Sequence, residues 1–377
     1  MKKPVVLIIE NSTHITGALK SILRTSEDLN EYYQFVFVLP RHSHARVEVE
    51  SRGFHVHELP LKELSRRPLS VLIYFPMLLW NAFRLRKIIR KEQVRIIHNN
   101  DLYNLLPVIL IFMGIKIPYL NHIRFLPEKF PAWLFGYWLR LHIKNAHAII
   151  CVSDHLRKQL PAHDKVKMIY NELPVTEKLE KALPTGNTIL YLSNVIRGKG
   201  QNFAIEAFAK IAHLHPQWKL RFVGGDMGME KNKKFKEELV AAIRHYKIEP
   251  QIEWSDFSND VESEYKKAAF AINFSESESF SITCLEAQYF GCPIIATRCG
   301  GPAEIIVDGQ TGFLVPVGDI KTMAEAMQKL IDDQPLRVTF AAHGRVHVRE
   351  KFSIQNTSYQ LKTQYDLIMD AYFVVNQ

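Results

Sequence analysis

Short runs of apolar and β-branched residues alternate with amphipathic stretches along most of this sequence. The stretch 78–91 is an example, because one face of a helix there would carry Leu78, Ala82, Leu85 and Ile89. Strands that alternate with helices in this way form βαβ units, whose strands lie parallel within one sheet. The alternation therefore predicts an α/β protein built on parallel sheets.

The alternation occurs in two series, on either side of a segment without a steady period. The predicted strands of the first series are 5–9, 35–39, 94–98, 119–122 and 148–152. Those of the second series are 188–192, 219–223, 252–254, 270–274, 294–297 and 313–315. The segment between them, 172–187, carries two prolines and is typical of an interdomain linker.

These two series predict two domains. At 377 residues the chain is long for one hydrophobic core and sufficient for two. We expect an N-terminal domain over 1–172 and a C-terminal domain over 188–354. A last amphipathic helix within 355–377 is expected to cross back onto the first domain.

The composition narrows the class of protein without naming its partner. The net charge of +9 at pH 7 favours acidic partners, namely nucleotide diphosphates, nucleic acid or an anionic membrane surface. The spacing of the four cysteines fits no common zinc pattern, so we expect reduced thiols and a cytosolic protein. These cysteines are Cys151, Cys284, Cys292 and Cys299.

The first residues of the chain combine two lysines with a short apolar run, as signal peptides do. The run covers only 4–9 and ends at Glu10, so it is better interpreted as a first β-strand. No run approaches the roughly 18 uninterrupted apolar residues that a membrane-spanning helix needs. We therefore expect neither a signal peptide nor a spanning helix.

The segment 275–297 is the strongest indication of a ligand site. It is typical of a serine-rich loop after a strand, a helix, a glycine stop and a further strand. Glu278 is then expected in the loop at the carboxyl end of the strand, and Glu286 about two turns into the helix. Open α/β sheets bind ligands at this edge, where helix amides point at anions. The alternative is that Glu278 is a solvated loop residue and Glu286 a surface helix residue.

Other residues follow the glutamate pair in a fixed order. They are Ala287, Gly291, Pro293, 296–297, 300–301, 304–306, 308–309, 311–315 and 318–319. Together with the pair they resemble the nucleotide-binding domain of retaining glycosyltransferases of family 4, the group 1 glycosyltransferases. The resemblance covers about 188–318, and more loosely the whole chain. It implies a GT-B fold, in which two Rossmann-like domains with parallel sheets face a central cleft.

The resemblance also implies roles for residues around the pair. The second glutamate of the family holds the donor ribose, which assigns that role to Glu286, and the first faces the donor sugar, which assigns that role to Glu278. The amides of Phe280, Ser281 and Ile282 are expected to start the helix and to donate hydrogen bonds to phosphate or sugar oxygens.

A second strand and loop, 192–200, resembles the family segment in which an arginine and a lysine hold the donor diphosphate. Lys199 matches the lysine directly, whereas Asn194 stands where the family has the arginine. Either Arg197 reaches the same phosphate, or Asn194 acts beside Lys199 as a neutral donor. A charge-assisted hydrogen bond contributes roughly 1.5–3 kcal/mol, so an arginine lost without replacement would be costly.

Three further residues match weaker family features. Gly224 follows a predicted strand and is expected under the nucleotide, although a plain turn is an equal alternative. Gly17 stands in the place of the family's glycine loop in the first domain, where Thr16 replaces the usual second glycine. His122 ends a predicted strand and matches a histidine that the family keeps near the transferred sugar. His98 ends the neighbouring strand and is a weaker candidate.

The resemblance implies a retaining glycosyltransferase, of the hexosyltransferase type, that uses a nucleoside-diphosphate sugar as donor. The acceptor would be a glycan or a lipid-linked hydroxyl in cell-envelope polysaccharide, lipopolysaccharide or glycolipid biosynthesis. No cofactor or metal is expected, and the chain has no Asp-x-Asp motif that would hold one. Two alternatives stay open. One is a nucleotide-sugar epimerase of the same fold, and the other a noncatalytic nucleotide or nucleic-acid binder, for which no ordered basic-aromatic motif is present.

A basic helix and an aromatic segment favour contact with an anionic membrane. The basic residues are Arg84, Arg86, Lys87, Arg90, Lys91 and Arg95, and the aromatic segment is 125–138. We therefore expect a cytoplasmic protein that associates peripherally with the inner face of the plasma membrane. The alternative is that both helices pack on the sheet and show their basic faces to water.

Overall fold

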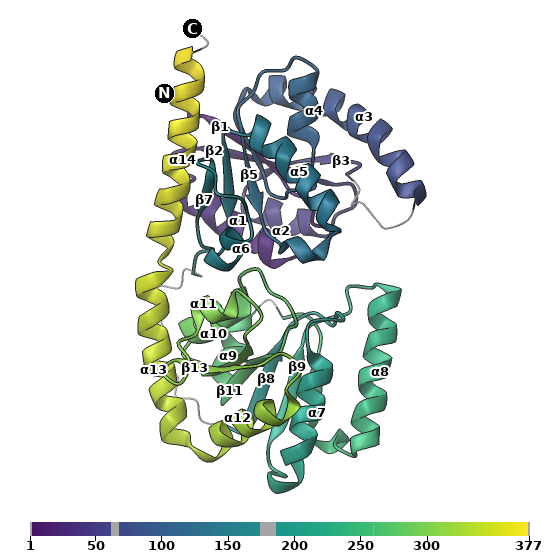
Figure 1. Ribbon diagram of the computed structural model, residues 1–377, viewed down its shortest axis with the longest axis vertical. Helices are drawn as coiled ribbons and strands as arrows, with labels where there is room; N and C mark the ends of the chain where they lie inside the picture. The colour runs from purple at the N-terminus through teal and green to yellow at the C-terminus, as the bar shows by residue number, and fades with distance from the viewer. Residues whose placement is uncertain (1, 62–67, 174–185, 259, 376–377) are drawn as a thin grey trace. The chain divides into compact units, whose positions relative to one another are not determined.

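The computed structural model describes residues 2–61, 68–173, 186–258 and 260–375. The chain divides into two compact units. The first comprises Met1–Glu172 and Ile354–Gln377, and the second comprises Leu173–Ser353 (Figure 1). Most of the predicted linker lies outside the described residues.

The first unit is a seven-stranded sheet in the order β3-β2-β1-β4-β5-β6-β7, with every neighbouring pair parallel. Its strands are β1 (Val5–Ile9), β2 (Gln34–Pro40), β3 (His55–Leu59), β4 (Val94–Asn99), β5 (Tyr119–Ile123), β6 (Ala148–Cys151) and β7 (Val166–Met168). Its α-helices are α1 (Gly17–Asp28), α2 (Ala45–Ser51), α3 (Pro68–Glu92), α4 (Leu106–Phe112), α5 (Ala132–Asn145), α6 (Asp154–Lys158) and α14 (Ile354–Val375).

The second unit is a six-stranded parallel sheet in the order β10-β9-β8-β11-β12-β13. Its strands are β8 (Thr188–Leu192), β9 (Lys219–Val223), β10 (Ile252–Ser255), β11 (Phe270–Asn273), β12 (Ile294–Thr297) and β13 (Gly312–Val315). Its α-helices are α7 (Gln201–Ile211), α8 (Glu230–Tyr246), α9 (Val261–Lys267), α10 (Ile282–Tyr289), α11 (Pro302–Ile305), α12 (Ile320–Asp332) and α13 (Gln334–Lys351).

The predicted α/β class and the two parallel sheets are confirmed. All five residues of β1 are buried, as expected for a central strand covered by helices on both faces. The edge strand β3 was not predicted, because His55, His57 and Glu58 interrupt its apolar run. The short edge strand β7 was not predicted either.

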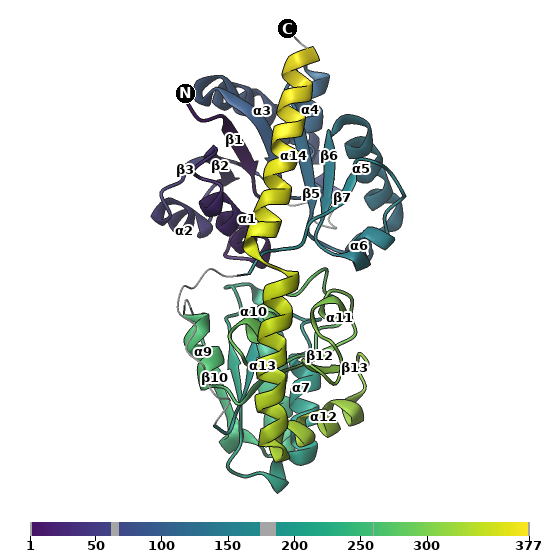
Figure 2. The same cartoon turned by 90° about the vertical axis from the view of Figure 1, so that its left-hand side faces the viewer.

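The last helix of the chain, α14, packs within the first unit. Its residues Leu361, Tyr365 and Ile368 belong to the same core cluster as β1 and β2. Figure 2 shows α14 lying along the sheet of this unit, where it contacts α1 and β4. The C-terminal helix therefore completes the hydrophobic core of the N-terminal sheet.

The four cysteines are unpaired and buried, which confirms the prediction of free thiols. Burial raises the pKa of the Cys299 thiol to about 11, so it stays protonated and unreactive at neutral pH. Over the described residues, no helix combines the length and the apolar character that crossing a membrane would require.

Candidate active site

A lysine and a glutamate meet at the carboxyl edge of the second sheet. Nζ of Lys199 lies 2.7 Å from Oε1 of Glu278, and the Ser275 hydroxyl donates to the same oxygen at 2.9 Å. The side chains are 33% and 16% exposed, so both are reachable from solvent yet partly shielded. The structure thus brings together two predicted site residues that are 79 positions apart.

The Glu278 carboxylate determines the charge of Lys199. Burial alone would lower the pKa of the lysine, but the adjacent carboxylate outweighs burial and raises the pKa above its ordinary value. Lys199 is therefore a cation at neutral pH. The charge of Lys199 is matched by the Glu278 carboxylate.

The loop that carries Lys199 is held against the end of β11. The backbone N–H of Phe274 donates to the Tyr191 hydroxyl at 3.0 Å, and that hydroxyl donates to the carbonyl of Lys199. Gly200 has φ of +79°, and a Cβ there would lie 1.9 Å from the carbonyl oxygen of Phe274. Only glycine permits this close approach of two backbones. The position of Lys199 thus depends on Gly200.

Gly224 has a similar role at the end of β9. Its φ is +143°, and a Cβ would lie 2.2 Å from the carbonyl oxygen of Ser193. The residue therefore lets the end of β9 pass directly beside the loop that carries Asn194 and Lys199. The structure places Gly224 against the backbone of Ser193, and its predicted place under the nucleotide stays a prediction.

The loop that carries Glu278 is pinned to residues 299–301. The backbone N–H of Glu278 donates to the Cys299 carbonyl at 3.1 Å, and the Gly301 N–H donates to the Glu278 carbonyl at 2.9 Å. A Cβ on Gly301 would lie 2.1 Å from the carbonyl oxygen of Phe280. The glycine pair that follows β12 therefore fixes the backbone of the candidate catalytic residue.

Helix α10 begins at Ile282, directly after the loop. Ser281 is its N-cap and accepts a hydrogen bond from the Cys284 N–H, while Asn273 donates to the Ser281 hydroxyl at 3.0 Å. Ser281 has φ of +87°, which is uncommon for a residue with a side chain and indicates a backbone held by its surroundings. Phe280, just before the cap, is buried.

Glu286 lies one turn into α10, not two, because the helix starts later than the sequence suggested. It is 1% exposed, so it is not the surface residue of the alternative interpretation. A carboxylate this well shielded from water forms strong hydrogen bonds with any hydroxyl that reaches it.

Arg197 does not join the pair. Its guanidinium binds both carboxylate oxygens of Glu238 in α8, at 2.6 and 2.5 Å, and lies over the Phe235 ring. The side chain is 67% exposed. In this structure Arg197 pairs with Glu238, so its contact with the donor phosphate stays a prediction. Asn194 is half-buried in the loop, and its backbone carbonyl accepts a hydrogen bond from Gln201 at 2.8 Å.

Two histidines and a tyrosine form a buried chain in the first unit. Nδ1 of His98 lies 2.6 Å from the Tyr365 hydroxyl, and Nε2 of His98 lies 3.3 Å from Nδ1 of His122. Burial, and then the nearby Arg124 cation, hold the pKa of both histidines well below the ordinary value, so both are neutral. His98, in β4, therefore helps to hold α14 in place through its hydrogen bond with Tyr365.

The direction of this hydrogen-bond chain decides which ring nitrogen of His122 carries the proton. If Tyr365 donates to His98, then His98 donates from Nε2 to Nδ1 of His122, and the proton of His122 must lie on its own Nε2. That Nε2 is buried and makes no hydrogen bond within the described part of the chain. With Tyr365 as the donor, Nε2 of His122 can donate one hydrogen bond, and with the chain reversed the same Nε2 is an acceptor.

Arg124, the second residue after His122, organises the carboxyl edge of the first sheet. Its guanidinium donates to Asn100 at 2.9 Å, to the Ser21 hydroxyl at 3.2 Å, and to Asn171. Asn100 in turn donates to Glu10, which directly follows β1. The prediction missed this network, because its members are scattered over the chain and each is common in loops.

A pocket opens at the same edge of the first sheet. Strand order reverses between β1 and β4, and such reversals create the crevices in which α/β sheets bind ligands. The lining residues are Asn11, Leu61, Tyr74, Met77, Leu78, Asn81, Tyr103, Asn104 and Leu106. Oδ1 of Asn81 is buried and accepts no hydrogen bond from any described residue. The pocket is therefore largely apolar, with an unmet acceptor in its wall.

Gly17 is the first residue of α1, and Thr16 caps the helix by accepting a hydrogen bond from the Leu19 N–H at 3.2 Å. The expected glycine loop is therefore a capped helix start. The Ser12 hydroxyl donates to Glu10 and also bonds Thr16, which orders the segment between β1 and α1.

Two family models match the chain in succession. Residues 15–173 match the model for glycosyltransferase family 4, and residues 176–347 match the model for group 1 glycosyl transferases. The chain belongs to the group 1 glycosyltransferases of GT-B fold. The expected family and fold are thereby confirmed.

Other glycosyltransferases resemble parts of this group 1 sequence. The capsular polysaccharide biosynthesis glycosyltransferase CapM of Staphylococcus aureus is 29% identical over 206 residues, which are 55% of this chain and 52% of CapM. The α-1,3/1,6-mannosyltransferase ALG2 of Dictyostelium discoideum is 32% identical over 59% of this chain and 56% of its own. The chain thus spans about half the length of the curated relatives it matches.

Solved structures show the same fold over the whole chain. HepE of Anabaena, solved with UDP and glucose, has a TM-score of 0.80 at 18% identity, and the match covers 96% of this chain and 99% of HepE. Sucrose-phosphate synthase of Thermosynechococcus elongatus has a TM-score of 0.79 at 18% identity, over 98% of this chain and all of its own. At such identities the likeness shows the fold alone.

Proposed function

We propose that this group 1 glycosyltransferase moves a sugar from a nucleoside-diphosphate sugar to an acceptor hydroxyl, with retention at the anomeric carbon. The observation that carries the proposal is the Lys199–Glu278 pair, because it sets a fixed cation beside a fixed carboxylate at the ligand-binding edge of the sheet. The name of CapM and the UDP and glucose bound to HepE support a sugar nucleotide donor and a role in cell-envelope polysaccharide, lipopolysaccharide or glycolipid biosynthesis.

Negative charge develops on the diphosphate as it leaves the sugar, and we assign its stabilisation to Lys199. Lys199 would leave Glu278 for a phosphate oxygen and stabilise the charge as the sugar departs. The amides at the start of α10, from Phe280 to Ile282, would add partial positive charge. The departing phosphate would take the proton of the acceptor hydroxyl on the same face, so no second carboxylate is needed.

Glu278, Glu286 and His122 would bind the donor itself. Glu278 would face the sugar once Lys199 has moved, and Glu286 would accept the two ribose hydroxyls. Since His122 is neutral, it would not act as a charged acid. With Tyr365 as the donor to His98, it would donate a hydrogen bond from Nε2. Gly17 and Asn194 stay weaker predictions for donor contact.

The pocket of the first unit is our candidate for the acceptor. Its apolar wall, with Tyr74, Met77 and Leu78, suits an aglycone or lipid portion, and the unmet Oδ1 of Asn81 suits a sugar hydroxyl. An acceptor of mixed character, such as a glycan on a lipid carrier, fits this lining better than a free charged metabolite does.

Peripheral association with an anionic membrane remains part of the proposal. Trp80 and Phe83 of α3 and Trp133 of α5 are 44%, 55% and 74% exposed, and Arg84 lies over the Trp80 ring. Co-sedimentation with phosphatidylserine vesicles but not with phosphatidylcholine vesicles is the expected result. Equal pelleting with both lipids, or with neither, would contradict it.

The function is tested by incubating the protein with UDP- and GDP-sugars, in the presence and absence of lipid-linked and glycan acceptors, and with EDTA throughout. Release of nucleoside diphosphate that depends on acceptor is the expected result. A ligand at 100 times its Kd should also stabilise the fold by roughly 2.7 kcal/mol, which allows donors to be screened by thermal shift first. An isomerised donor without acceptor would indicate the epimerase, and binding without turnover would indicate a noncatalytic binder.

A further inference from the structure

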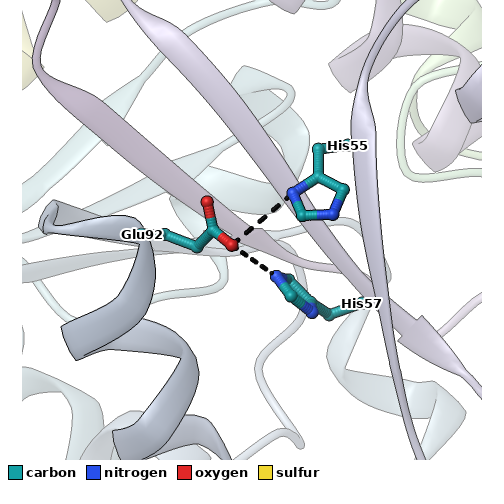
Figure 3. A group of neighbouring side chains, drawn as sticks. All are labelled: His55, His57 and Glu92. Carbon is teal, nitrogen blue, oxygen red and sulfur yellow. Dashed lines mark hydrogen bonds and ion pairs between the residues drawn. The ribbon is translucent and has the colours of Figure 1, made fainter.

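We propose that His55, His57 and Glu92 form a zinc site in the first unit. The three side chains converge from two elements, as Figure 3 shows: the histidines come from β3 and the glutamate from the last residue of α3. One ligand atom of each residue lies within 4.8 Å of those of the others. Within the described ranges no other three-residue group of this kind occurs.

The secondary structure explains why these side chains meet. Successive side chains of a strand point to opposite faces, so His55 and His57 share one face of β3. The intervening Val56 is buried on the other face, where Glu58 binds Arg46 of α2. On this face the His55 side chain is 52% exposed and the His57 side chain 18% exposed.

The distances already resemble the spacing of ligands around a bound ion. Nε2 of His57 lies 2.9 Å and Nδ1 of His55 lies 3.6 Å from the same oxygen of Glu92. Two ligand atoms that each lie about 2.0–2.1 Å from a tetrahedral zinc are separated by roughly 3.3 Å, so small rotations of the side chains would admit the ion.

The charge around Glu92 also favours a cation. A carboxylate at the C-terminus of a helix faces the negative end of the helix dipole, which is unfavourable unless a positive group compensates. Lys91 approaches to 4.0 Å, but its side chain is 72% exposed and free to turn into water. The Glu92 side chain is only 12% exposed, so a bound cation would compensate a largely shielded charge.

Two imidazoles and one carboxylate are a donor set for zinc, with a water molecule in the fourth position. The 52% exposed His55 side chain leaves room for that water. The site lies at the amino edge of the sheet, because His55 begins β3 and Glu92 is followed closely by β4. His98 and His122 lie next to the last residues of β4 and β5, near the opposite edge, so the zinc would tie β3 to α3 and take no part in sugar transfer.

Cobalt titration of the tag-free, EDTA-treated full-length protein tests this site. We expect a visible absorption band that saturates at one equivalent of Co²⁺ and disappears when Zn²⁺ is added. His57→Ala and Glu92→Gln should each weaken Co²⁺ binding by about 100-fold, since loss of even an outer-sphere partner costs 10–100-fold. Zn²⁺ should also raise the unfolding temperature of the wild type. It should leave the unfolding temperatures of His57→Ala and Glu92→Gln unchanged.

His163→Ala is the matched control, because His163 pairs with Asp164 at 3.1 Å but belongs to no three-residue cluster among the described residues. This variant should bind Co²⁺ like the wild type. If His57→Ala fails to fold, His55→Ala takes its place in the test. His55→Ala removes a half-exposed side chain and should therefore fold like the wild type. A wild type without the band, or a band unchanged in His55→Ala and Glu92→Gln, would show an ordinary hydrogen-bonded cluster and overturn the proposal.

Discussion

Replacing Glu278 by glutamine is expected to lower kcat for sugar transfer by about 100-fold or more, the range seen when one preorganised electrostatic contact is removed from an active site. The binding of UDP should not weaken, because Lys199 loses the carboxylate that competes with phosphate. The measurement is steady-state release of nucleoside diphosphate, together with calorimetric titration of UDP.

Glu276→Gln is the control for this substitution. Glu276 lies in the same loop and is exposed, and its backbone N–H donates to the Gly198 carbonyl at 2.9 Å. A change of its side chain should leave kcat within about twofold, since surface substitutions usually have small effects. A catalytic role for Glu278 would be refuted by wild-type turnover in Glu278→Gln, or by equal losses in both variants.

Replacing Gly200 by alanine is expected to destabilise the second unit by about 3–5 kcal/mol, a cost reserved for strained backbones and overpacked sites. The added Cβ would lie 1.9 Å from the carbonyl oxygen of Phe274, which directly follows β11, so one of the two backbones would have to shift. Urea denaturation should show the loss as a lower midpoint, and donor binding should fail as well, because the loop carries Lys199.

Gly198→Ala separates the close contact from the left-handed conformation. Gly198 also has a positive φ, +90°, but a Cβ there would meet nothing within 4 Å. Its substitution should therefore cost only about 1–2 kcal/mol, the left-handed penalty of a residue with a side chain. Equal destabilisation by the two substitutions would show that the close contact with Phe274 does not determine the position of the loop.

The alternation of strands and helices could be predicted from the sequence. Central strands are buried on both faces and are therefore continuously apolar, which makes them easy to recognise. The strands Val5–Ile9 and Thr188–Leu192 were predicted with their observed bounds. Helix α3 begins at Pro68, ten residues before the predicted start, and Pro76 lies inside it. Proline usually interrupts a helix, so local propensity alone could not indicate that start.

The candidate site was predicted in part. Local pattern could place Lys199 and Glu278 at the carboxyl ends of strands, and the fold then brings them together. It could not show that Arg197 binds Glu238, since that contact depends on how α8 packs beside the loop. Nor could it show that Tyr365 reaches His98, 267 residues away, because only tertiary packing brings α14 onto β4.

A crystal structure of the protein with UDP tests the central claim most directly. We predict that Nζ of Lys199 leaves Glu278 and lies about 2.9 Å from a diphosphate oxygen, at the distance of a charge-assisted hydrogen bond. The ribose hydroxyls should then lie against the carboxylate of Glu286. UDP bound elsewhere, or bound with the Lys199–Glu278 contact of 2.7 Å intact, would contradict the assignment of this pair to the donor site.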